Sequence, residues 1–225
     1  MDKYLPFLRS LELFEDMDDA SILKLLKCLS ARELRFDHQQ IVWSRSLEMP
    51  FMCVVVEGGL MIVQEDWRGN RSIIGSFGPG EFISEGAIGV LEGVLPFYLS
   101  VRAETVVLVF SNEAAMNPCD GNCGAHGLFL RNLINALLQK EMRLLYKIEY
   151  LSRRTTREKL MSFLTIQSAR QGSRKVTVEF TRQELADFLS VDRSAMCTEL
   201  SHMKQDGLIR YDRRCFELLD DVVNK

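Results

Sequence analysis

The chain of 225 residues carries a formal net charge of −3, with 47% hydrophobic and 26% charged residues. This length suits one large domain or two modest ones, and the composition excludes a collagenous, low-complexity or wholly disordered chain. The most apolar segment, 49–63, is interrupted by Glu57 and two glycines. It falls short of the ~20 residues of a membrane-spanning helix.

The N-terminal segment and the cysteines predict a cytoplasmic protein with no membrane partner. The first residues include acidic side chains and lack the cationic start, apolar run and small-residue cleavage site of a signal peptide. The six cysteines are scattered rather than dense. In a reducing compartment this usage favours thiols over disulfides.

The charges are divided unevenly along the chain. Residues 1–120 contain 10 Lys and Arg against 18 Asp and Glu, whereas residues 121–225 contain 18 against 13. The densest basic stretch, 153–182, holds eight Lys and Arg against Glu158 and Glu179. Such a stretch suits phosphate neutralisation, but it is also typical of an ordinary solvated face, so charge alone does not decide the function.

The first half of the chain predicts a short helix followed by an antiparallel β domain. We expect Asp18 or Asp19 to cap the helix, and four apolar residues at helical spacing to pack it: Ile22, Leu25, Leu26 and Leu29. From about residue 41 to 110, short runs rich in Val, Ile, Phe and Tyr alternate with glycine-containing turns. Strands about ten residues apart without intervening helices favour a barrel or roll.

A long helix is predicted after the small-residue linker 116–127. Residues in alternating steps of four and three form a coiled-coil seam: Leu130, Ile134, Leu137, Glu141, Leu144, Ile148 and Leu151. A second apolar stripe lies beside it: Leu133, Leu138, Met142 and Leu145. This surface exceeds what one packing partner covers, so we expect one face to meet a second subunit. The alternative is a core helix of a monomer, and the carboxylate of Glu141 requires a partner or solvent.

The last third predicts three helices and three short strands. A capping box at Thr155 and Glu158 opens a helix that ends near Gly172, and a strand over 175–179 follows. A second capping box, Thr181 and Glu184, starts a short helix that ends at a turn at 190–191. We expect Asp192 to cap the next helix, 193–205, and Gly207 to stop it. Its inward residues are Ala195, Met196, Leu200 and Met203. Two strands, 208–211 and 215–218, turn at 212–214.

Two helices joined by a short turn and followed by a β-hairpin form a winged helix-turn-helix, whose second helix fits the ~12 Å major groove of DNA. We expect Arg193 to read a base, with pairing to a phosphate as the alternative, and Ser194 and Thr198 to add weaker contacts. The candidate DNA-binding set is completed by Thr181 and Arg182 at the start of the first helix and by Arg213 and Arg214 on the wing turn.

Three segments resemble the Crp/Fnr family of transcription regulators. FTRQELADFLSVDRSAM with QDGLI resembles the family's DNA-binding motif, GPGEFISEGAI its cyclic-nucleotide-binding cassette, and IEYLSRRTTREKLMSFL the end of its dimerisation helix. The resemblance implies an α+β fold: an antiparallel β-roll (double-stranded β-helix) at 1–120 that senses an effector, a linker and dimerisation helix at 121–152, and a winged helix-turn-helix at 153–225. It also implies a homodimer on palindromic double-stranded DNA, with RNA polymerase as a candidate partner.

The resemblance fails at the positions that hold a cyclic nucleotide in the family. The candidate pocket comprises Ser84 and Glu85, where the family has glycine and glutamate, and Phe97 and Tyr98, where it has an Arg-Ser pair. A phosphate buried without its cation is unfavourable, so we expect an unknown small-molecule effector that is not a cyclic nucleotide. A purely structural role for Glu85 stays open. Ser190 in place of the turn glycine and Thr198 in place of an arginine predict a different DNA specificity.

Cys119, Cys123 and His126 lie within eight residues, and some family members sense oxygen or redox state through iron-sulfur clusters. A fourth ligand would have to be Cys28 or Cys53, so we expect no metal or cofactor and keep a redox-active thiol pair as an alternative. His38 and His202 are expected at the surface. Because catalytic motifs are lacking, we expect no enzyme. A second alternative is a dimeric protein-interaction module with a vestigial winged helix.

Overall fold

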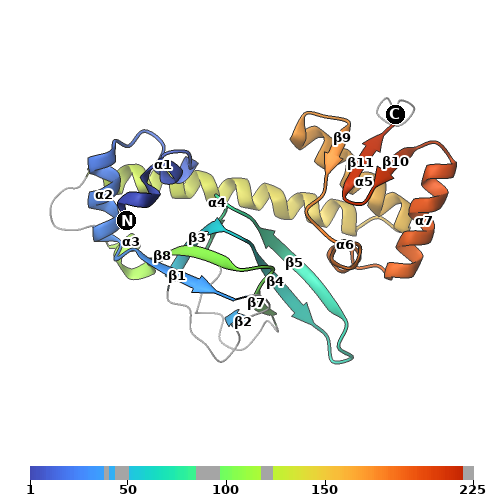
Figure 1. The fold of residues 1–225 in the computed structure, drawn as a ribbon, viewed down its shortest axis with the longest axis horizontal. Helices are drawn as coiled ribbons and strands as arrows, with labels where there is room; N and C mark the ends of the chain where they lie inside the picture. Colours follow the sequence, from blue (N-terminus) through green and yellow to red (C-terminus); the bar gives the residue numbers. More distant parts are fainter. Residues whose placement is uncertain (38–40, 44–50, 85–96, 118–123, 220–225) are drawn as a thin grey trace. The chain divides into compact units, whose positions relative to one another are not determined.

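The computed structural model describes residues 1–37, 41–43, 51–84, 97–117 and 124–219. The chain forms two compact units, Met1–Lys140 and Glu141–Lys225. The boundary falls within α4 (Gly124–Leu151), which is a single helix (Figure 1).

Short helices open the first unit: η1 (Asp2–Tyr4), α1 (Leu5–Leu8), η2 (Glu12–Phe14) and α2 (Asp19–Cys28). The N-cap of α2 is Asp18, whose carboxylate accepts a 2.8 Å hydrogen bond from the amide of Ser21. This contact satisfies a backbone donor that the helix leaves unpaired. The predicted packing residues Ile22, Leu25, Leu26 and Leu29 are all buried, which confirms the predicted helix.

The strands of the first unit form two four-stranded sheets. The strands are β1 (Arg32–Phe36), β2 (Ile41–Trp43), β3 (Phe51–Glu57), β4 (Leu60–Glu65), β5 (Arg71–Phe77), β6 (Phe82–Ile83), β7 (Phe97–Val101) and β8 (Thr105–Ser111). The orders are β1-β8-β3-β6 and β2-β7-β4-β5, and every pairing is antiparallel. The predicted antiparallel roll is confirmed, although it begins at Arg32 rather than near residue 41.

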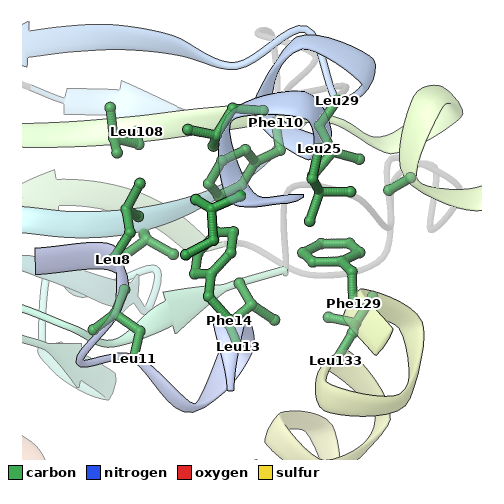
Figure 2. Close-up of a cluster of buried hydrophobic side chains, with 14 of the residues drawn as sticks. Leu8, Leu11, Leu13, Phe14, Leu25, Leu29, Leu108, Phe110, Phe129 and Leu133 are labelled. Carbon is green, nitrogen blue, oxygen red and sulfur yellow. The ribbon is translucent and has the colours of Figure 1, made fainter. Parts of the chain in front are cut away.

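The apolar runs of β3 and β8 are continuous because both faces of their sheet are covered. Alternate residues such as Val55 and Val107 face a cluster shared with β4, β5 and β7. The others, including Leu108 and Phe110, face the short helices and the start of α4. Figure 2 shows this second cluster, in which the ring of Phe14 lies 6.3 Å from the ring centroids of both Phe110 and Phe129.

The hairpin between β4 and β5 ends in an exposed tryptophan. The carboxylate of Asp66 accepts hydrogen bonds of 2.8 Å from the amides of Arg68 and Asn70 and one of 2.7 Å from the Asn70 side chain. Gly69 has a φ of 79°, which glycine adopts without strain. This fixed turn presents Trp67 with 86% of its surface exposed and the guanidinium of Arg68 4.4 Å from its ring.

After β8, the short helix α3 (Asn112–Met116) precedes α4. The long helix begins at Gly124, within the segment 116–127 that was predicted to be a linker. Ala125 and Phe129 are buried in the cluster of Figure 2. Their burial favours a helix in a segment whose glycines alone disfavour it.

The second unit contains the end of α4, α5 (Thr156–Gln171), β9 (Lys175–Thr177), α6 (Arg182–Leu189), α7 (Arg193–Gln205), β10 (Ile209–Asp212) and β11 (Cys215–Leu218). The strands form an antiparallel sheet in the order β10-β11-β9. Both predicted capping boxes are present. The predicted inward position of Ala195 is wrong: it is exposed, because it lies in the projecting first turn of α7.

Aromatic rings join the end of α4 to α5 and α6 in this unit. The ring of Tyr150 lies 5.6 Å from that of Phe163 and 5.8 Å from that of Phe188. Lys147, also on α4, is buried with its ammonium 4.0 Å from the centroid of the Phe188 ring. The last turns of α4 therefore share a core with the helix-turn-helix.

Candidate nucleic-acid interface

The turn between α6 and α7 is stabilised from α5. Ser190 adopts a left-handed conformation (φ 51°, ψ 57°), which costs on the order of 1 kcal/mol relative to glycine. The ammonium of Lys159 lies 3.2 Å from the carbonyl oxygen of Leu189 and 3.5 Å from that of Ser190. This lysine, which belongs to the basic stretch, therefore stabilises the turn through its hydrogen bonds.

The N-terminal end of α7 presents the residues predicted to contact DNA. Asp192 is the N-cap and accepts a 2.8 Å hydrogen bond from the amide of Ala195. Met196, Leu200 and Met203 are buried and fix the rotation of the helix. Arg193, Ser194 and Thr198 are exposed, as predicted, whereas Cys197 is half-buried.

The wing is the β10–β11 hairpin, whose last pair is Asp212 with Cys215. Its two turn residues, Arg213 and Arg214, are exposed, and Arg213 has a φ of 47°. The wing turn thus carries two exposed cations, at the positions where the sequence predicted the turn.

Arg182 contacts two aromatic rings that the sequence did not predict to lie near it. It is the first residue of α6, next to its N-cap Thr181, and is half-buried. Its guanidinium carbon lies 4.9 Å from the ring centroid of Tyr211 and 4.7 Å from that of Phe216. Burial lowers the pKa of Arg182 from its ordinary value. The proximity of these rings, about 30 residues further along the chain, has no signal in the sequence pattern.

Other cations of the basic stretch are paired within the unit. Arg157 forms ion pairs with Glu199 on α7 and, at 2.7 Å, with Asp206. Arg153 pairs with Glu149, and the hydroxyl of Ser162 also donates to this carboxylate. These contacts hold the pKa of Glu149 below its usual range. The basic stretch is therefore partly neutralised, and its formal charge overstates what phosphates would meet.

Two of the four residues predicted to form the effector pocket have described side-chain contacts. Ser84 lies near α4, with its hydroxyl 3.5 Å from the ammonium of Lys140. Tyr98 donates a 2.6 Å hydrogen bond to Glu65, and burial, with this bond, raises the pKa of Tyr98. Because its neighbour Leu99 belongs to the interior cluster of the roll, Tyr98 occupies the opposite face of β7.

The other two predicted pocket residues are less fully described. Phe97 pairs with Gln64 through the backbone of β7, and its side chain lies outside the description. Glu85 lies outside the described residues. The pocket stays a prediction.

The seam of α4 is solvent-exposed in the single chain. The exposed seam residues are Ile134, Leu137, Glu141, Leu144 and Ile148, whereas Leu130 and Leu151 are half-buried. In the second stripe, Leu138, Met142 and Leu145 are also exposed, but Leu133 is buried in the core of the first unit.

His126 is buried with its Nε2 2.8 Å from the carbonyl oxygen of Ala115, while its Nδ1 has no hydrogen-bond partner among the residues that the structure describes. Cys119, Cys123 and His38 lie outside the described residues, and His202 is exposed. Cys53 is buried and Cys28 half-buried. Within the described ranges, no group of three or more His, Cys, Asp or Glu side chains could hold a metal. No helix there is long and apolar enough to cross a bilayer.

Comparison with known proteins defines the class of the DNA-binding unit. Residues 158–221 match the Crp-like helix-turn-helix domain. The transcriptional activator FnrL of Cereibacter sphaeroides is 22% identical over 193 residues, which cover 81% of this chain and 74% of FnrL.

Solved structures of similar fold cover nearly the whole chain. A variant of CooA from Carboxydothermus hydrogenoformans is similar with a TM-score of 0.71 at 18% identity, covering 94% of this chain and 96% of CooA. FixK2 from Bradyrhizobium japonicum is similar with a TM-score of 0.64 at 17% identity, covering 84% and 93%. Residues 158–221 therefore form a Crp-like helix-turn-helix domain, and the similarity to the solved structures shows that the chain shares their fold.

Proposed function

We propose that this chain is a transcription regulator of the Crp/Fnr family. In this proposal it acts as a cytoplasmic homodimer that binds a palindromic operator in double-stranded DNA and responds to a small molecule other than a cyclic nucleotide. The observation that carries the DNA-binding part is the end of α7. A capped helix held by three buried residues exposes Arg193, Ser194 and Thr198 beside a wing with two exposed arginines. Helix ends of this kind read base edges in the major groove.

The exposed face of α4 supports the dimer. Leu137, Leu144 and Ile148 are 42%, 51% and 63% exposed, and a row of large apolar residues is unfavourable in water. Parallel pairing of two such seams covers these residues. The two copies of α7 then meet successive major grooves about 34 Å apart, on half-sites related by two-fold symmetry.

The proposed effector site is in the first unit, and the lack of an Arg-Ser pair at Phe97 and Tyr98 supports the exclusion of cyclic nucleotides. Tyr98 is engaged with Glu65 on the opposite face of β7 from the roll interior. The same proposal includes RNA polymerase as a partner, as the resemblance to the family implies.

Selection from random duplexes tests the DNA-binding function. The full chain is incubated with a pool of random 30-base-pair duplexes, and bound DNA is amplified and sequenced over several rounds. We expect an inverted repeat to be enriched and to compete much better than a scrambled duplex at equal salt. Equal competition by both duplexes at every salt concentration contradicts the proposal and favours an interaction module with a vestigial winged helix.

A further inference from the structure

The N-terminus of α6 and the wing are joined by a contact between one cation and two aromatic rings. Arg182 lies within 5 Å of the ring centroids of Tyr211 on β10 and Phe216 on β11. The two rings are 5.9 Å apart at an angle of 37°. Phe216 is buried and Tyr211 half-buried, so the guanidinium lies against the packed side of the hairpin.

The location of this cation is unusual for a residue that serves only to attract phosphate. A positive side chain at the first position of a helix is disfavoured by the helix dipole. Arg182 is also half-buried, which further disfavours its charge. The two rings offset this cost, because a guanidinium is attracted to aromatic faces and can lie flat on them.

We propose that Arg182 is a positioning residue that holds the wing against α6, so that the turn at Arg213 and Arg214 meets the DNA backbone. The inference rests on the DNA-binding function proposed above. Arg182 then contributes to DNA binding through the wing, and a direct contact with a phosphate is not its main role.

A second cation supports the same arrangement from the other helix of the motif. The ammonium of Lys204, near the end of α7, lies 5.5 Å from the ring centroid of Tyr211. The wing tyrosine is thus contacted from both helices of the motif. The contact of Tyr211 with Lys204 is longer than its contact with Arg182, and Lys204 is exposed. We therefore assign the larger part of the stabilisation of the wing to Arg182.

Hydrogen exchange on the free protein tests the positioning without any DNA. In Arg182→Ala, we expect the amides of 209–218 to exchange roughly tenfold faster while those of the buried part of α7 are unchanged. Arg182→Lys keeps the charge but cannot lie flat across both rings, so most of the effect should remain. Arg170→Ala, at an exposed arginine of α5, is the control for loss of charge. Unchanged exchange in the wing of Arg182→Ala overturns the proposal.

A double-mutant cycle on the selected operator tests the consequence for binding. If Arg182 acts through the wing, Arg182→Ala in an Arg213→Ala, Arg214→Ala background weakens binding by less than about twofold further. If Arg182 binds a phosphate itself, its loss is additive in both backgrounds, and Arg182→Lys retains most of the affinity. Additive losses of affinity overturn the proposal even where the selection experiment succeeds. If neither the wild type nor any variant selects DNA, the DNA-binding function is rejected, and the hydrogen-exchange result alone decides whether Arg182 positions the wing.

Discussion

Arg193 is the first helical residue of α7 and is exposed next to the N-cap Asp192. Its guanidinium can form two parallel hydrogen bonds with a guanine edge. We expect Arg193→Ala to cost ~1 to 3 kcal/mol per half-site on the operator and much less on random DNA. Competition binding with both duplexes measures this difference, with Arg170→Ala as the control. Equal losses on both duplexes would show that Arg193 only contacts a phosphate.

Lys147 makes the stability of the second unit depend on pH. Burial lowers its pKa from 10.5 to about 7. Between these values the unfolded chain holds the proton more tightly, so the free energy of unfolding rises with pH from about 7 to about 10.5. The slope is at most ~1.4 kcal/mol per pH unit, and below pH 7 the cost of burying the ammonium is fully present.

The variant Lys147→Met isolates this effect, because it keeps an unbranched stem against Phe188 without the charge. We expect the variant to be more stable than the wild type at pH 6, with the difference shrinking as the pH rises to 9. Urea unfolding at several pH values measures it, and Lys175→Met, at an exposed lysine, is the matched control. Parallel pH curves for wild type and Lys147→Met contradict the assignment.

Some site residues were predictable because their signals are local in sequence. The caps Thr155, Thr181 and Asp192 are recognised from a hydroxyl or carboxylate just before a helical pattern, and all three cap as predicted. The environments of Arg182 and Tyr98 were not predictable. Each is set by residues 29 or more positions away, brought near by the wing and by the pairing of β7 with β4.

Among the elements, two turns of the roll provide a matched pair of glycines: Gly58 lies between β3 and β4, and Gly69 lies in the β4–β5 hairpin. Gly58 and Gly69 both have a φ of 79°. A Cβ added at Gly58 would lie 2.2 Å from the carbonyl oxygen of Glu104, whereas a Cβ added at Gly69 would have no atom of the described residues within 4 Å. We expect Gly69→Ala to cost ~1 to 2 kcal/mol for its backbone conformation and Gly58→Ala ~2 to 5 kcal/mol, since overpacking adds to it. Denaturant unfolding compares them, and equal costs would mean that the turn at Gly58 relaxes freely.

The seam of α4 is testable at residues that are exposed in the single chain. Leu137→Asp and Leu144→Asp should therefore leave each unit folded but dissociate the dimer, since each places a charge in a surface shared by two helices. Sedimentation measures the mass, and circular dichroism checks the fold. Asn135→Asp, at an exposed position outside the seam, is the control. If the wild type is dimeric and both variants remain so, the interface lies elsewhere.

Element predictions failed where tertiary packing outweighs local composition. β1 reads RELRF, with three charged residues among five, as suits an edge strand, and β8 is its partner among the described strands. This charged pattern is the reason that the strand was not predicted. The first turn of α4 contains two glycines and was taken as linker, but buried Ala125 and Phe129 stabilise it as helix. The helix α7, whose apolar residues recur at helical spacing, was predicted with its observed bounds, 193–205.

At the scale of the whole molecule, the proposed function predicts that the protein does not bind the cyclic nucleotides that related receptors bind. Cyclic AMP and cyclic GMP at millimolar concentration should give no thermal shift, because the positions of the Arg-Ser pair hold Phe97 and Tyr98. A dissociation constant of a tenth of the ligand concentration would add ~1.4 kcal/mol, so binding of that strength would be visible. A clear stabilisation by either nucleotide would reject the altered pocket.

Trp67 gives the molecule an optical reporter at the tip of the β4–β5 hairpin. It is one of two tryptophans in the chain, and its indole is 86% exposed on a turn that Asp66 holds in place. Dissolved iodide can reach such an indole and quench its emission. When a surface covers the indole, the emission shifts to shorter wavelength. In a Trp43→Phe background, Trp67 is the remaining tryptophan. Its fluorescence therefore reports, without any attached dye, whether DNA, an effector or a second protein changes the surroundings of this hairpin tip.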